Sequence, residues 1–222
     1  AWAYTAHLST QPLMPMTQPW AAADFAFMLF MWTVMMVAMM LPSATPMMVL
    51  FAQVNRRRLE AARPYVPTAI FAAGYLVAWT TFSLAATLIN WRLHQGQVLT
   101  SMMGHTTPWV AGALLLATGI YQWTPFKRAC LTYCRSPLGF LMAHQREGRV
   151  GAFVTGIHHG VYCLGCCWLL MGLLFALGIM NLAWVAALAV FVLAEKLFPA
   201  GNIVARTAGV GLMGWGVWLL AV

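Results

Sequence analysis

The chain has 222 residues, of which 62% are hydrophobic and only 7% are charged, whereas a soluble globular domain carries about 25% charged residues. That composition excludes an ordinary soluble domain and predicts an integral membrane protein. A net charge of +8 would suit a nucleic-acid partner in a soluble protein, but the basic residues here are confined to a few connecting segments, so we expect no nucleic-acid partner.

Apolar runs of membrane-spanning length fill most of the chain, since about 20 apolar residues cross a bilayer as a helix. We expect an all-α fold, a polytopic membrane helix bundle with about six transmembrane helices. They form a single transmembrane helical domain, 24–222, preceded by an N-terminal segment, 1–23. The expected spans are residues 24–52, 66–90, 108–124, 150–176, 180–198 and 202–221.

Basic residues mark one side of this bundle, and only Arg92 lies in a loop on the other side. Because Lys and Arg concentrate in cytoplasmic loops, both termini and the segment 1–23 are predicted to face the periplasm, in a multi-pass protein of the bacterial inner membrane. The basic residues on the predicted cytoplasmic side are Arg56, Arg57, Arg58, Arg63, Lys127, Arg128, Arg135, Arg146, Arg149, Lys196 and Arg206.

The first span is unusually rich in methionine. One stripe at helical spacing contains Met28, Met31, Met35 and Met39. Thioethers are soft ligands that select Cu(I), so this stripe is a candidate ion relay; the alternative is that flexible methionines fill irregular helix interfaces. The methionines of the span are Met28, Met31, Met35, Met36, Met39, Met40, Met47 and Met48.

Two prolines interrupt the same span. Pro42 and Pro46 are predicted to break the helix and to free backbone carbonyls, because proline lacks the N–H that a helix requires. Irregular backbone at membrane depth is tolerated only beside protein or a cavity, so we expect this part of the span to face the inside of the bundle.

The largest polar segment, 125–149, follows the third span. Pro125 stands at a favoured first helical position and predicts a short amphipathic helix on the inner membrane surface. Cys130 and Cys134 stand at i and i+4 on that helix, where the neighbouring Lys and Arg side chains should lower the pKa of both thiols. The pair is a candidate two-thiolate ion acceptor on the cytoplasmic side; the alternative is an interfacial anchor with idle thiols.

The fourth span places imidazole and thiol groups inside an apolar run. On a helix, His159, Cys163 and either Cys166 or Cys167 can point to one side. A further imidazole, His158, directly precedes His159. Imidazole with thiolate suits Cu(I) or Zn(II), and polar groups at membrane depth indicate function. Two alternatives remain open: buried cysteines that only pack, and disulfide exchange through the CxxC pair Cys163 and Cys166.

The fifth span ends in an acidic residue, Glu195, followed directly by Lys196. At a helix end both side chains would reach water as a solvated pair, whereas deeper in the membrane Glu195 must pair with a cation or take a proton. The short connection around Gly178 and Asn181 predicts that the fourth and fifth spans form an antiparallel hairpin. Glycines in the sixth span predict close packing of that helix against another.

Four sequence blocks, which begin at Met35, Tyr121, His159 and Met180, resemble a known bacterial family. It is an uncharacterised family described as predicted metal-binding integral membrane proteins, a domain of unknown function. The resemblance covers the chain from Met28 onward and implies metal binding without a settled ion. The metal-site candidates among the matching positions, to which His158 is added, are Met35, Met36, Met39, Met40, Cys130, Cys134, His159, Cys163, Cys166, Cys167 and Glu195.

These features predict a membrane protein that binds a soft metal, Cu(I) with zinc as the alternative ion, for delivery or transport across the inner membrane. Its expected partners are the lipid bilayer and either other membrane subunits or a metallochaperone. Two other hypotheses stay open: an accessory subunit of a larger membrane metalloenzyme complex, and a membrane thiol-disulfide oxidoreductase. An enzymatic activity is the less favoured interpretation, and the chain has no G-x-x-x-x-G-K-[ST] motif of an ATP-driven pump.

Overall fold

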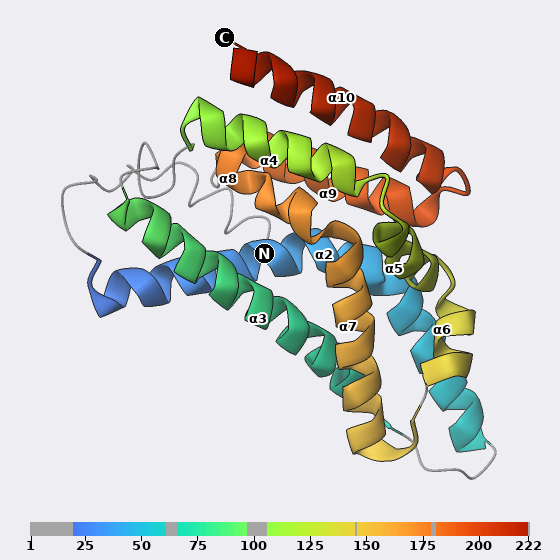
Figure 1. Ribbon diagram of the computed structural model, residues 1–222. Coiled ribbons are helices and arrows are strands. Elements are labelled where there is room, and N and C mark those ends of the chain that lie inside the picture. The colour runs from blue at the N-terminus through green and yellow to red at the C-terminus, as the bar shows by residue number, and fades with distance from the viewer. Residues whose placement is uncertain (1–19, 61–65, 97–105, 145, 179–180, 222) are drawn as a thin grey trace.

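The structure is a computed structural model in which residues 20–60, 66–96, 106–144, 146–178 and 181–221 are described (Figure 1). Throughout those ranges every regular element is an α-helix, which confirms the all-α class. Most of the expected N-terminal segment lies outside the described residues. The helices are α2 (Ala22–Glu60), α3 (Thr68–Gln95), α4 (Pro108–Tyr121), α5 (Pro125–Arg135), α6 (Pro137–His144), α7 (Gly148–Gly172), α8 (Leu174–Leu177), α9 (Leu182–Leu197) and α10 (Gly201–Ala221).

Four candidate membrane spans stand out by length and apolar composition. They correspond to α2, to α3, to α7 continued by α8, and to α10. The expected third and fifth spans coincide with α4 and α9, but these helices have 14 and 16 residues, fewer than the roughly 20 that cross a bilayer. The prediction of six spans with periplasmic termini therefore stays a prediction, whereas four helices have the length and composition to cross a membrane.

Helix α2 contains Pro42 and Pro46 and yet runs through its 39 residues without a break, so the predicted break is wrong. Figure 1 shows that α2 instead changes direction near its middle, which is what proline does by removing a backbone N–H and crowding the preceding turn. Side chains bond to a carbonyl of that turn: the Met40 oxygen accepts from Ser43 Oγ at 2.9 Å and from Tyr75 OH at 3.2 Å. The bend thus lies against α3, which supplies Tyr75.

Helices α3 and α7 pack closely because glycines lie where they cross. A Cβ on Gly74 of α3 would overlap the backbone oxygen of Phe153, and a Cβ on Gly156 of α7 would overlap the backbone oxygen of Phe71. Such close approach of two backbones is typical of glycine in membrane helix pairs. One turn beyond Gly156, α7 begins the run of histidine and cysteine, so this crossing places that run beside α3.

Helices α4 and α10 lie side by side in Figure 1 and share a second glycine contact. A Cβ on Gly209 of α10 would lie 3.0 Å from the backbone oxygen of Gly119, and a Cβ on Gly216 would lie 2.9 Å from that of Gly112. The predicted close packing of the last span is confirmed at these positions. Other glycines of α10 do not take part, since a Cβ on Gly211 would meet nothing within 4 Å.

Candidate metal centre

Three cysteines of α7 point into the protein interior. Cys163, Cys166 and Cys167 are each exposed by 1% or less, as expected for residues three and four apart on one helical face. The Sγ atoms of Cys166 and Cys167 both donate to the backbone oxygen of Cys163, each at 3.0 Å. Their thiols are therefore turned back against the helix that carries them.

Two further cysteines reach the same place from α5. A Cβ on Gly165 of α7 would lie only 2.6 Å from Cys130 Sγ, so the glycine admits α5 to this face of α7. The Cys134 thiol interacts with the thiols of Cys163 and Cys166. The structure thus brings together all five cysteines of the chain, which we call the thiol cluster: Cys130, Cys134, Cys163, Cys166 and Cys167.

The two cysteines of α5 have raised pKa values, contrary to the expectation that neighbouring cations would lower them. Burial raises the pKa of the Cys130 thiol, and contact with the α7 thiols followed by burial raises the pKa of the Cys134 thiol well above its ordinary value. The cations of α5 are engaged elsewhere: Lys127 is paired with Glu195, and Arg135 donates to backbone oxygens just beyond α9. Burial at Cys130, and the neighbouring thiols together with burial at Cys134, therefore outweigh the attraction of the positive charges for the pKa of these thiols.

A lysine and a tyrosine that the sequence did not indicate complete the surroundings of Cys163. Lys196 Nζ donates to Cys163 Sγ at 3.0 Å and to Ser43 Oγ at 2.9 Å. The hydroxyl of Tyr75 lies 3.2 Å from Cys163 Sγ. Lys196 was counted among the surface cations, yet only 6% of it is exposed. The clue in the sequence was its place next to Glu195 in an apolar helix, where a charge needs a partner.

The methionines of α2 line the core that contains the α7 cysteines, and we call them the methionine wall. Met40 Sδ lies 3.9 Å from Cys167 Sγ, which brings a thioether to the edge of the thiol cluster. The same methionines pack in one hydrophobic core with the cysteines of α7. The predicted stripe is therefore continuous with the cluster, although burial alone also fits the packing alternative. The methionines of this wall, each exposed by 2% or less, are Met28, Met31, Met35, Met36, Met39 and Met40.

Glu195 forms a buried ion pair on the side of α9 that faces α5. Its two carboxylate oxygens accept from Lys127 Nζ at 2.8 and 2.9 Å, and each residue is 1% exposed. The side-chain oxygen of Gln122 also accepts from Lys127 Nζ. Of the two alternatives for Glu195, the buried carboxylate paired with a cation is confirmed, but its partner is Lys127 and not the adjacent Lys196.

The two predicted histidines have different surroundings. His159 is 3% exposed and packs among the rings of Phe71, Tyr75 and Phe140. Its Nδ1 atom is buried without a hydrogen-bond partner, which is a costly state for a polar atom and marks a nitrogen able to accept a ligand. His158 is only partly buried, and its ring centroid lies 6.0 Å from that of His144 on α6.

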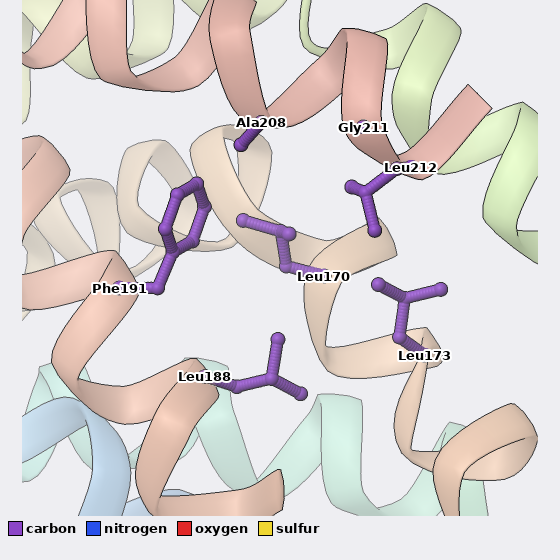
Figure 2. A pocket seen from close by; sticks show the side chains of 7 residues that line it. All are labelled: Leu170, Leu173, Leu188, Phe191, Ala208, Gly211 and Leu212. Atoms are coloured by element: carbon purple, nitrogen blue, oxygen red, sulfur yellow. The ribbon is translucent and has the colours of Figure 1, made fainter. Parts of the chain in front are cut away.

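An apolar hollow of about 230 Å³ lies between the C-terminal end of α7, α9 and α10 (Figure 2). The residue of α7 that lines this hollow is Leu170, which follows Cys167 by three positions. Every side chain drawn there is built of carbon, so the hollow offers no metal ligand. It is lined by Leu170, Leu173, Leu188, Phe191, Ala208, Gly211 and Leu212.

The donor set fits a soft ion, although the side chains are not arranged around one. Among the residues that the structure describes, no three His, Cys, Asp or Glu side chains are positioned to hold a metal ion. The Cys166 and Cys167 thiols bond to a carbonyl instead, and rotation about their Cα–Cβ bonds is needed to turn them outward. Thiolates with a thioether select Cu(I), which is satisfied by few ligands, more than Zn(II), whose structural sites are closed tetrahedra.

Residues 29–219 match the sequence model of a family described as PpoB2, copper chaperone. The matched range contains the whole thiol cluster, Lys196 and the methionine wall of α2. No match was found among curated proteins or among solved structures.

Proposed function

The chain belongs to the PpoB2 copper-chaperone family, and from this premise we propose that it holds Cu(I) in the thiol cluster and delivers it within the bacterial inner membrane. The observation that carries the proposal is that thiols of α5 and α7 lie near one another where these helices pack, with Met40 Sδ 3.9 Å from Cys167 Sγ. Thiolate and thioether are the ligands that Cu(I) prefers. A metallochaperone or another membrane subunit would supply or accept the ion.

The methionine wall extends this site along α2. Met28, Met31, Met35 and Met39 form a buried stripe that leads toward Met40 and the cluster. Neutral thioethers bind Cu(I) without losing a proton, so the ion can pass along them with no proton released or taken up, while it keeps its single positive charge. We infer that this stripe is the path by which copper reaches or leaves the thiols.

Burial also weighs against the thiol-disulfide alternative. Exchange requires that a thiolate reach the sulfur of a partner, so the attacking cysteine must be accessible. Cys163 and Cys166 form the CxxC pair, and each is 1% exposed. A small ion can reach such a position through side-chain movement, whereas a protein disulfide cannot.

The double substitution Cys163→Ser with Cys166→Ser tests the proposal. Serine keeps the shape of cysteine but offers a hard oxygen to a soft ion. We expect the affinity for Cu(I) to fall by at least about tenfold in a competition titration with a Cu(I) chelator. The melting temperature in detergent should stay close to that of the wild type. Unchanged copper affinity in the folded variant would show that these thiols only pack in the core and do not bind copper.

A second prediction concerns the stripe of α2. Replacing Met28, Met31, Met35 and Met39 with leucine preserves apolar volume, a swap that usually costs less than about 1.5 kcal/mol per site. We expect the protein to stay folded while copper transfer into or out of proteoliposomes fails, because leucine has no lone pair for Cu(I). Met47→Leu, at a buried methionine of a separate core cluster, is the control. Normal transfer in the stable quadruple variant would show that these methionines only pack.

A further inference from the structure

Two imidazoles lie just outside the thiol cluster and have no part in it. His144 is the last residue of α6, and His158 lies on α7. Their ring centroids are 6.0 Å apart and their planes are nearly perpendicular, at 86°. Both side chains are partly exposed. The pair therefore combines two metal-binding groups from different helices with access from outside the core.

The ring of His144 is held in a fixed orientation. It stacks on Phe140 at a centroid distance of 4.8 Å, and Nδ1 lies 3.3 Å from the backbone oxygen of Phe140, one turn earlier in α6. In the tautomer in which Nδ1 carries the proton and donates it to that oxygen, the lone pair of Nε2 is left as an acceptor. Metal-binding histidines commonly have this arrangement, because a carbonyl bond at one nitrogen sets the tautomer and the orientation of the other. Nε2 faces the hydroxyl of Tyr162 at 3.4 Å.

The imidazole pair adjoins the thiol cluster through two tyrosines. Tyr162 and Tyr133 each contact the His144 ring at 5.5 Å. In the sequence, Tyr162 directly precedes Cys163, and Tyr133 directly precedes Cys134. The His144 ring thus contacts, on both α5 and α7, the tyrosine that directly precedes a cysteine of the thiol cluster. The buried Nδ1 of His159, next to His158 in the sequence, has no hydrogen-bond partner and adds a further nitrogen at this boundary.

We propose that His144 and His158 form a second, nitrogen-type copper site at which the ion pauses between the surroundings of the protein and the thiol cluster. Imidazole is a suitable ligand for copper. Two imidazoles that share an ion through metal–nitrogen bonds of about 2 Å have ring centroids roughly 6 Å apart. The ring centroids of His144 and His158 are 6.0 Å apart. The role as a stage before the thiols rests on the proposed function, but the site itself does not.

X-ray absorption at the copper edge separates the two sites, because sulfur and nitrogen ligands have different bond lengths. The full chain in detergent is titrated with Cu(I) supplied as its acetonitrile complex, first limiting and then in excess. In the wild type we expect sulfur-bound copper first and an added nitrogen-bound fraction in excess copper. The variant H144Q/H158Q should lose most of the nitrogen-bound fraction, by about tenfold or more in affinity, and keep the sulfur-bound one.

Two matched variants keep the test decisive. His94→Gln alters a buried histidine at the end of α3 and should leave both fractions intact. His158→Gln alone removes a partly exposed ring and should weaken the nitrogen-bound fraction without disturbing the Phe140 stack. An unchanged nitrogen-bound fraction in H144Q/H158Q, or none in the wild type, would overturn the proposal. If sulfur-bound copper is absent while nitrogen-bound copper depends on these two residues, the proposed function fails and the imidazole site stands.

Discussion

Replacing Glu195 with glutamine is expected to destabilise the protein by about 3–5 kcal/mol, the usual effect of removing one partner from a buried ion pair. Lys127 is 1% exposed, and the Glu195 carboxylate is its charged partner, at 2.8 Å. The amide of glutamine leaves the ammonium buried without a counter-charge. The pair also ties α5 to α9, so its loss should displace the α5 cysteines from the thiol cluster. A lowered melting temperature in detergent is the measurement.

A double substitution provides the internal check on this ion pair. Glu195→Leu with Lys127→Met removes both charges and keeps apolar volume, which is often neutral or stabilising in buried sites. We expect most of the lost stability to return. Arg128→Met changes the neighbouring exposed cation and should have little effect. A Glu195→Gln protein that melts with the wild type would show that the ion pair does not hold the helices together.

Replacing Lys196 with methionine is expected to weaken Cu(I) binding on the order of tenfold to a hundredfold. Two thiolates and one Cu(I) ion carry a net negative charge, and an unbalanced charge in a buried site is costly. Lys196 Nζ lies 3.0 Å from Cys163 Sγ and supplies the balancing charge. Competition with a Cu(I) chelator measures the change in affinity.

The remaining contact of Lys196 supplies a control for structural effects. Ser43→Ala removes its other hydrogen-bond partner, at 2.9 Å, and leaves the charge beside the thiol. We expect copper affinity to change little in this variant, and Lys196→Arg, which keeps a cation there, to bind more tightly than Lys196→Met. Equal affinity of Lys196→Met and the wild type would show that the lysine has no part in copper binding.

Much of the helical organisation follows from the sequence, because long apolar runs have few other structures open to them. The expected spans 66–90 and 150–176 coincide with α3 and with α7 continued by α8. The bend of α2 was misjudged as a break, since a proline pattern shows the loss of a hydrogen bond but not the packing against α3 that keeps the helix continuous. Six membrane crossings remain a prediction, because α4 is only 14 residues long.

The candidate site was only partly predictable. Helical spacing places Cys163 and Cys166 on one face, because that relation is local. The approach of Cys134, Lys196 and Tyr75 to Cys163 depends on contacts between distant helices, which no local spacing reveals. Counting basic residues by loop indicates a side of the membrane and not a partner, so it gives no sign that Lys196 is buried beside Cys163.

Binding of Cu(I) in the thiol cluster can be tested directly by one measurement. The purified protein is loaded with limiting Cu(I), washed, and studied by X-ray absorption at the copper edge, beside a variant in which Cys163, Cys166 and Cys167 are serine. We expect retained copper with sulfur as its only near neighbours, and loss of that copper in the variant. Copper with an oxygen or nitrogen shell under these conditions, or the same sulfur shell in the variant, would contradict it.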